Sequence, residues 1–279
     1  MKTFTLDLSL DYKKMGVAEP KRAPLMRAYI LEEDSLECSY GKTRPAVVVC
    51  PGGGYSYTSP READPIALSY LAAGFHSFVV DYSCSPTGWP AACCEISKAI
   101  SYIREHADEY NIDKNKIIVC GFSAGGHAAA SVGVHYNNDV VKEFAEVDGI
   151  KNKPDGMILC YPVITDDLEK THIGTYDNFC LGKADAKDYF GLEHFVDENT
   201  PKSFIWHTYE DNAVPVQNSM KFASALIENN VNCELHIFPK GGHGLSLADK
   251  RVAAPESINN YPIGVDVWMD MSIRWIENL

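Results

Sequence analysis

The stretch KIIVCGFSAGGH at residues 116–127 decides the fold of this chain. Residues 116–120 have the apolar, β-branched character of a buried strand, and the residues after Ser123 have the composition of a helix. A G-x-S-x-G pattern between a strand and a helix is typical of a nucleophile elbow, a sharp turn that holds its serine clear of the sheet. Gly121 and Gly125 leave room for the close backbone approach that this turn needs. The alternative is a serine that caps the helix, with glycines that serve helix packing.

Apolar runs like this one recur along the chain, with helix-period stretches between them. This pattern predicts an α/β fold with βαβ units and a mostly parallel sheet covered by helices on both faces. The predicted strands of this sheet are 46–50, 76–82, 116–120, 156–161, 203–208 and 233–238, with antiparallel strands near 3–8 and 25–31 beside them. The predicted helices are 65–73, 91–106, 124–134, 216–230 and 265–277.

A nucleophilic serine needs a base, and the base needs an acid that fixes its tautomer. Residues of both kinds follow later predicted strands: Asp211 comes after 203–208, and His243 comes after 233–238 between flanking glycines. The order Ser123, Asp211, His243 along the chain is the order found in α/β-hydrolases. We therefore expect these three residues to be catalytic.

Three neighbouring residues offer alternatives to this assignment. Glu210 adjoins Asp211 and could take its role as the acid. His127 lies four residues after Ser123 on the same predicted helix, where a packing or hydrogen-bonding role is expected rather than that of the base. His207 ends a predicted strand and is expected to support the acid loop.

A glycine-rich loop, Pro51-Gly52-Gly53-Gly54-Tyr55, directly follows the predicted strand 46–50. We expect the amides of Gly53, Gly54 and Ala124 to form an oxyanion hole, which usually lowers a barrier by several kcal/mol. A phosphate-binding loop is the rival interpretation. It is not supported, because no Lys-Ser/Thr follows the glycines and no G-x-G-x-x-G frame is present.

Composition limits the partners of the protein. The formal net charge of −13 would repel nucleic acid and anionic lipid surfaces, so neither nucleic acid nor membrane is an expected partner. The first ten residues alternate in polarity and carry Asp7, so we expect no signal peptide and a cytoplasmic protein. The 9 cysteines lie mostly in apolar runs without C-x-x-C spacing, which favours reduced, buried thiols. No metal and no cofactor are expected.

We expect one domain over residues 1–279, because no internal repeat, low-complexity tract or linker is present. One interval, 163–202, is too long for an ordinary connection between two strands. It contains the aromatic residues Tyr176, Phe179, Tyr189, Phe190 and Phe195. We expect a cap insertion over the active site. The alternative is a peripheral helical insertion that makes no contact with substrate.

These motifs together resemble the esterase/lipase branch of the α/β-hydrolase superfamily, which contains acetyl xylan esterases, feruloyl esterases and related sugar-ester hydrolases. The resemblance runs from about Arg44 to the end of the chain. It rests on residues 51–55, on Arg61-Glu62-Ala63-Asp64-Pro65-Ile66-Ala67, on residues 121–127, and on the positions of Asp211 and His243. Many relatives have His where this chain has Pro51, so any role of that His in stabilising the loop must be filled otherwise.

The resemblance implies hydrolysis of small acyl esters, often acetyl groups on sugars or xylo-oligosaccharides, through an acyl-enzyme and without a cofactor. The substrate is expected to be a small-molecule ester. Tyr55, Tyr57 and Tyr161 are expected in the wall of its pocket, because aromatic faces suit sugar rings, with packing as the alternative role. Two other functions stay open: a serine peptidase of the same fold, and a non-catalytic ligand-binding homologue.

Overall fold

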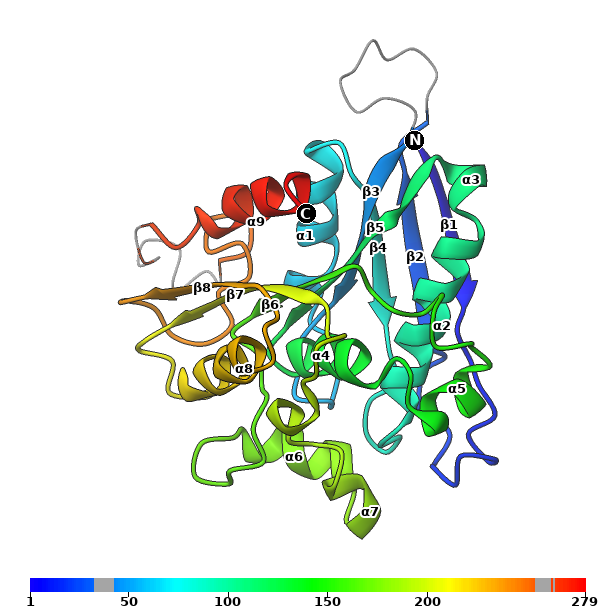
Figure 1. The fold of residues 1–279 in the computed structure, drawn as a ribbon, viewed down its shortest axis with the longest axis vertical. Coiled ribbons are helices and arrows are strands. Elements are labelled where there is room, and N and C mark those ends of the chain that lie inside the picture. The colour runs from blue at the N-terminus through cyan, green and yellow to red at the C-terminus, as the bar shows by residue number, and fades with distance from the viewer. Residues whose placement is uncertain (33–42, 254–261, 263) are drawn as a thin grey trace.

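One sheet of eight strands forms the centre of this computed structural model, which describes residues 1–32, 43–253, 262 and 264–279 (Figure 1). The spatial order is β1-β2-β4-β3-β5-β6-β7-β8. The strands are β1 (Lys2–Asp7), β2 (Leu25–Ile30), β3 (Arg44–Cys50), β4 (His76–Asp81), β5 (Ile112–Phe122), β6 (Gly156–Cys160), β7 (Lys202–Thr208) and β8 (Cys233–Phe238). The pairs β1–β2 and β2–β4 are antiparallel, and all other pairs are parallel. The predicted α/β fold class is confirmed.

Helices cover both faces of the sheet. The principal ones are α1 (Asp64–Ala72), α2 (Ala91–Glu105), α4 (Ala124–His135), α8 (Gln217–Glu228) and α9 (Trp268–Glu277), and these match the five predicted helices within a few residues. Side chains alternate along each strand, so each strand contributes to both layers. Val48 of β3 packs with α2 and α4 in one layer, whereas Val47 packs with α1 and α9 in the other.

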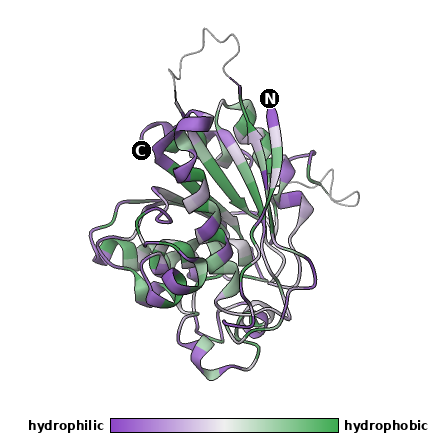
Figure 2. Cartoon of the chain, turned by 90° about the vertical axis from the view of Figure 1, so that its right-hand side faces the viewer, coloured by the Kyte–Doolittle hydropathy of each residue, from purple (hydrophilic) through white to green (hydrophobic). Residues whose placement is uncertain are grey.

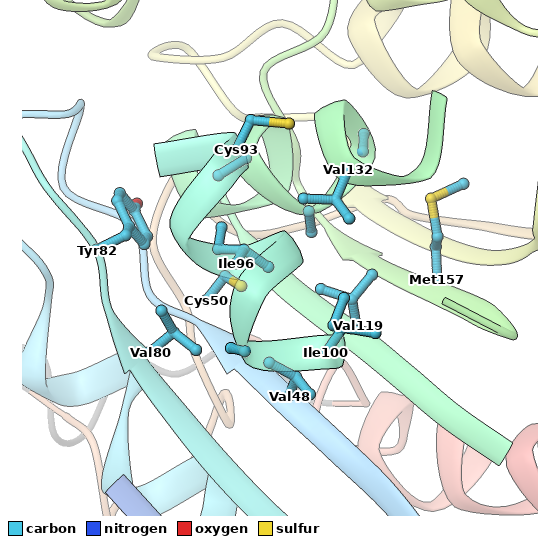
Figure 3. Close-up of a cluster of buried hydrophobic side chains, with 14 of the residues drawn as sticks. Val48, Cys50, Val80, Tyr82, Cys93, Ile96, Ile100, Val119, Val132 and Met157 are labelled. Atoms are coloured by element: carbon cyan, nitrogen blue, oxygen red, sulfur yellow. The ribbon is translucent and has the colours of Figure 1, made fainter. Parts of the chain in front are cut away.

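The layer beneath α2 and α4 is a close-packed apolar core. In Figure 3, Ile96 and Ile100 of α2 point toward Val48 and Val119 on the sheet, and all four are fully buried. Figure 2 shows hydrophobic residues concentrated in the strands, as expected for a sheet covered on both faces. Burial of this apolar surface supplies the main driving force for folding.

Several elements differ from the prediction. Strand β5 begins at Ile112 rather than at residue 116, because Arg44 pairs with Ile112 whereas Ala46 pairs with Ile117. The polar residues between these two pairs form an irregularity that hides the start of the strand. The short elements η1 (Pro60–Glu62), α3 (Ala107–Tyr110) and α5 (Asp139–Ala145) were not predicted.

The eight described cysteines are unpaired, and Cys38 lies outside the described residues. Among the described helices, none has the length and hydrophobicity that a bilayer crossing requires.

The interval 163–202 folds into α6 (Ile173–Cys180), α7 (Ala184–Lys187) and η2 (Leu192–Phe195), next to α4 (Figure 1). Its aromatic residues pack inward, and Phe179 and Phe190 both contact the ring of His127 on α4. His127 Nε2 donates a hydrogen bond to Phe190 O at 3.0 Å, and its Nδ1 accepts one from Tyr55 Oη at 2.9 Å. His127 therefore has the packing and hydrogen-bonding environment expected from the sequence.

Buried histidines make the fold sensitive to acid. Burial lowers the pKa of His127 to about 3, and the pKa values of His76 and His135 to about 4. An unfolded histidine titrates near pH ~6.5. Between these pH values the unfolded chain binds more protons than the folded one, so the histidine contribution to stability is lost as the pH falls. Burial raises the pKa of Glu95 to about 7. The contribution of Glu95 to stability therefore grows as the pH falls, which is opposite to that of the histidines.

A histidine variant isolates this effect from that of Glu95. Glutamine can replace His127 without losing the donor to Phe190 O or the acceptor for Tyr55. Between pH 7 and pH 5 we expect His127→Gln to lose about 1–2 kcal/mol less unfolding free energy than the wild type, because it has no group to protonate. Urea unfolding at both pH values measures this difference. Equal losses in the two proteins would show that His127 takes up a proton in the folded protein as readily as in the unfolded chain, contrary to this prediction.

Candidate active site

Ser123 occupies a strained turn between β5 and α4. Its φ of 54° and ψ of −118° are unusual for a residue with a side chain, and they mark the nucleophile elbow. A Cβ on Gly121 would lie 2.2 Å from Gly125 O, and a Cβ on Gly125 would lie 2.1 Å from Cys50 O. Both positions therefore require glycine. The Ser123 side chain makes no capping hydrogen bond to α4, which rules out the helix-cap alternative.

The hydroxyl of Ser123 is instead the end of a hydrogen-bonded chain of three side chains. Ser123 Oγ lies 2.7 Å from His243 Nε2, and His243 Nδ1 lies 2.6 Å from Asp211 Oδ2. Ser123 and Asp211 are buried, and the His243 side chain is 24% exposed. The structure thus brings together the three residues expected to be catalytic, in a geometry that allows the imidazole to take the serine proton.

Hydrogen bonds keep Asp211 ionised in spite of its burial. Burial raises the pKa of Asp211, but contacts with His207 and His243 and backbone amides outweigh this effect, so that the pKa lies well below its usual range. Asp211 Oδ1 accepts hydrogen bonds from Ala213 N at 3.0 Å and Val214 N at 2.9 Å. An ionised carboxylate in this place fixes the tautomer of His243 and stabilises its protonated form.

The alternatives to these assignments are resolved by position. Glu210 bonds to Lys240 and to the amide of Gly241, so its carboxylate is engaged away from His243. His207 is fully buried, and its Nε2 lies 2.9 Å from Val214 O and 3.4 Å from Asp211 Oδ2. It therefore supports the acid loop, as its place at the end of a strand predicted.

The loop after β3 lies directly beside the serine, since a Cβ on Gly52 would be 3.0 Å from Ser123 Cβ. Gly53 and Gly54 have φ values of 131° and 62°, which disfavour any side chain. Within the described part of the chain, the amides of Gly53, Gly54 and Ala124 have no hydrogen-bond acceptor. The loop that begins next to Ser123 thus carries two unpaired donors, and Ala124, directly after the serine, carries a third; unpaired amides of this kind are what an oxyanion hole uses.

Neighbouring side chains hold this loop in place, although it has Pro51 where many relatives have His. Pro51 O accepts a hydrogen bond from Tyr82 Oη at 2.5 Å, and Gly52 N donates to Glu62 Oε2 at 2.9 Å. Asn178 of α6 donates to Gly54 O at 2.8 Å. The loop is therefore fixed by contacts from three different segments of the chain.

The three tyrosines expected in the pocket wall have different environments. Tyr57 is 59% exposed at the surface of the glycine-rich loop, so it is accessible to a substrate. Tyr55 and Tyr161 are only 4% and 1% exposed, and their hydroxyls bond to His127 and Glu62. Both side chains thus pack in the interior, which is the alternative role given for them above, and their place in the pocket wall stays a prediction. Their backbones have positive φ values of 54° and 38°. Tyrosine rarely adopts this conformation, and the sequence around these residues does not indicate it.

Two residues near the site were missed by sequence reasoning. His172 begins α6, and its Nδ1 accepts a hydrogen bond from Thr175 N at 3.2 Å. Its ring lies 3.7 Å from where a Cβ on Gly54 would be, and burial and the charge of His243 lower its pKa. Tyr209, 72% exposed, directly precedes the acid loop. Neither residue belongs to a recognisable motif; the fold brings His172 to the glycine-rich loop, whereas Tyr209 lies two residues before Asp211 in the sequence.

Metal-binding potential is limited to one group in the described part of the chain. Asp166, Glu193 and His194 have ligand atoms within 4.8 Å of one another. Asp166 and His194 are exposed, and Lys221 already lies 3.9 Å from a Glu193 oxygen. This group contains none of the residues Ser123, His243 and Asp211. Acyl transfer by a serine, a histidine and an aspartate needs no metal.

Comparison with known proteins places these observations in a wider context. The sequence matches the BD-FAE family over residues 36–226. It is 36% identical over 264 residues to endo-1,4-beta-xylanase B of Butyrivibrio fibrisolvens. The aligned region covers 86% of this chain and 40% of that protein. The sequence is 30% identical over 251 residues to an acetylxylan esterase of Xylanibacter ruminicola, which covers 87% of this chain and 46% of that protein. The chain thus spans less than half the length of these two relatives.

Solved structures share the fold over nearly the whole chain. An acetyl ester-xyloside bifunctional hydrolase from Caldicellulosiruptor lactoaceticus is 33% identical, with a TM-score of 0.80 and coverage of 99% of this chain and 96% of that one. A carboxylesterase from Lactobacillus plantarum is 26% identical, with a TM-score of 0.83 and coverage of 100% and 98%. Both are similar in fold to the architecture described above.

The elbow geometry predicts that Gly125 cannot be replaced. In Gly125→Ala the added methyl would meet two backbone oxygens, Cys50 O at 2.1 Å and Pro51 O at 2.3 Å. Backbone cannot move aside as a flexible side chain can, so we expect a loss of about 3 kcal/mol or more of unfolding free energy. Chemical denaturation followed by circular dichroism measures it.

Gly242→Ala is the matched control, because a Cβ at Gly242 meets nothing within 4 Å. Its unfolding free energy should stay within about 0.5 kcal/mol of the wild type. If Gly125→Ala were as stable as this control, the close contact between α4 and the end of β3 would not be a requirement of the fold.

Proposed function

The chain belongs to the BD-FAE family of the α/β-hydrolase superfamily, and we propose that it is a serine carboxylesterase that removes short acyl groups, in particular acetyl groups, from sugars or xylo-oligosaccharides. The observation that carries this proposal is the hydrogen-bonded chain from Ser123 through His243 to Asp211, beside three unpaired amides. This arrangement supports acyl transfer, because it combines an activated nucleophile with donors for the oxyanion.

The first half of the proposed reaction transfers the acyl group to the enzyme. His243 Nε2 takes the proton of Ser123 as Oγ attacks the ester carbonyl carbon. The carbonyl oxygen becomes an oxyanion, to which the amides of Gly53, Gly54 and Ala124 donate hydrogen bonds. The intermediate collapses, the bond to the alcohol oxygen breaks, and His243 gives its proton to the leaving alcohol. Asp211 stabilises the imidazolium throughout.

The second half regenerates the enzyme. Water gives a proton to His243 and attacks the acyl carbon, which forms a second oxyanion in the same site. The bond to Ser123 Oγ then breaks, the carboxylic acid departs, and the serine recovers its proton from the imidazole. Each proton taken by His243 is thus returned, so the enzyme needs no cofactor.

Sugar esters are favoured as substrates by the relatives and by the surface around the site. The names of two relatives include acetylxylan esterase and acetyl ester-xyloside hydrolase. Tyr57 and Tyr209 expose aromatic rings on two loops that lead to the triad, and such rings can stack on sugar faces. The peptidase and the ligand-binding protein remain the alternative functions, and the experiments below separate them.

We further propose that the segment 163–202 is a cap that shapes the pocket within a single domain. Asn178 of α6 bonds to Gly54 O and to Ser56 Oγ, each at 2.8 Å. His172 adds a ring next to Gly54. These contacts with the oxyanion loop favour a cap over a peripheral insertion without contact to substrate.

Replacing the nucleophile tests the mechanism. We expect Ser123→Ala to lower kcat for p-nitrophenyl acetate by at least ~10³-fold, because the variant cannot form the acyl-enzyme. Circular dichroism and the melting temperature establish that the variant is folded. A serine-directed phosphonate should label the wild type and not the variant. A wild-type protein that is neither labelled nor active on any ester would be a ligand-binding homologue.

Comparing substrates tests the proposed specificity. We expect the rate to fall from p-nitrophenyl acetate to butyrate to octanoate, and acetate to be released from acetylated xylo-oligosaccharides. The rates come from absorbance and from an acetate assay, with Ser123→Ala as the blank. Faster hydrolysis of dipeptide amides than of any ester would identify a peptidase. Preference for octanoate would contradict the short acyl group.

A further inference from the structure

Glu62 is a buried carboxylate beside the site that the mechanism above does not use. It ends η1 and is only 5% exposed. Its Oε2 accepts a hydrogen bond from Gly52 N at 2.9 Å, and its Oε1 accepts one from Tyr161 Oη at 2.7 Å. Burial raises its pKa, and these two hydrogen bonds act in the opposite direction. Since both partners donate, the arrangement suits the charged form of the carboxylate.

One of these hydrogen bonds leads to the oxyanion loop. Gly52 directly precedes the glycines whose amides are unpaired, and its backbone touches both Glu62 and the nucleophile. A Cβ on Gly52 would lie 2.7 Å from Glu62 Oε2 and 3.0 Å from Ser123 Cβ. The hydrogen bond from Gly52 N therefore sets where the loop begins relative to Ser123.

The other hydrogen bond leads to the base. Tyr161 Oη accepts a hydrogen bond from Ser246 N at 2.8 Å, three residues after His243. The Tyr161 ring packs edge-on against the His243 ring, with centroids 5.1 Å apart and an interplanar angle of 72°. Ser246 Oγ also donates to Arg61 O at 2.6 Å. The loop that carries the base is thus attached to η1 at two points.

We propose that Glu62 is a positioning residue that fixes the oxyanion loop and the His243 loop relative to each other. Its two carboxylate oxygens connect the elements that must act together when the oxyanion forms. The proposal rests on the ester hydrolysis proposed for Ser123. Because pre-set geometry of donors and base lowers the barrier, a shift in either loop should slow the chemical step more than it weakens substrate binding.

The chain contains a matched control for this proposal. Glu95 of α2 is fully buried, and it also accepts hydrogen bonds from a tyrosine hydroxyl and a backbone amide, together with one from the hydroxyl of Ser83. Tyr12 Oη lies 2.9 Å from its Oε1, and Ser83 N lies 2.7 Å from its Oε2. Neither partner belongs to the triad, the oxyanion loop or the His243 loop. Glu95→Gln therefore disturbs a similar buried carboxylate that contacts neither loop directly, although its partner Ser83 adjoins Tyr82, which bonds to Pro51 O.

Glu62→Gln should impair catalysis specifically. Glutamine keeps an acceptor for Gly52 N, but its amide nitrogen then faces Tyr161 Oη, which can no longer donate there and must accept in addition to the hydrogen bond from Ser246 N. With p-nitrophenyl acetate we expect kcat to fall about 10- to 100-fold and KM to change less than about threefold. The rate at which a p-nitrophenyl phosphonate labels Ser123 should fall in parallel. Glu95→Gln should lower the melting temperature and keep kcat within about twofold of the wild type.

Tyr161→Phe is a second variant that removes the link at its other end. Tyr161→Phe should also lower kcat. Its effect should not add to that of Glu62→Gln, because both variants disrupt the same hydrogen bond between Tyr161 and Glu62. If Glu62→Gln does not fold, the kcat of Tyr161→Phe decides the question. Wild-type kcat in the folded Glu62 variant, or an equal loss in Glu95→Gln, would overturn the positioning role. An inactive wild type would instead overturn the proposed esterase function itself.

Discussion

The structure depends on one close contact, where the backbone of Gly125 at the start of α4 touches the backbone at the end of β3. Any side chain there would collide with Cys50 O and Pro51 O. The helix behind the nucleophile is therefore held against the strand that leads into the oxyanion loop. Parallel strands present their carboxyl ends at one edge of the sheet, so β7 and β8 deliver Asp211 and His243 to the same edge. With this contact in place, the order of the strands brings Asp211 and His243 to Ser123.

Three buried ionisable groups near this edge differ in the shift of their pKa because their neighbours differ. His127 lies between a tyrosine hydroxyl and a carbonyl oxygen, and burial lowers its pKa to about 3, so it is a neutral link between segments. Asp211 receives several hydrogen bonds, which more than offset the effect of burial and keep it charged. Glu62 has two donors only, and burial raises its pKa. Burial is thus common to all three, and the number and kind of hydrogen-bond partners decide how far it shifts each pKa.

Much of the fold and the core of the candidate site could be predicted from the sequence, because both are encoded locally. An apolar strand, a G-x-S-x-G turn and a helix fall in consecutive residues, and Asp211 and His243 each follow a recognisable strand. For Tyr55 and Tyr161 the sequence left a pocket role and a packing role open, and it did not reveal their positive φ values, which tyrosine rarely adopts. The link through Glu62 was equally hidden. Glu62 stands in the motif at residues 61–67, but its link joins residues far apart in the sequence, and the motif does not show which residues it bonds to.

The loop proposed to bind the oxyanion shows how a site can be pre-organised without the histidine that many relatives have at position 51. Its amides can stabilise a developing charge only if they point toward it before the reaction, because reorientation during the reaction would consume the stabilisation. Three glycines make the loop adaptable, and adaptability alone would work against this requirement. Tyr82, Glu62 and Asn178 supply the missing restraint from three separate segments, each through a single hydrogen bond. Asn178 belongs to the 163–202 segment, so its hydrogen bond couples the folding of that insertion to the ordering of the loop amides. A change in the conformation of one should therefore alter the conformation of the other.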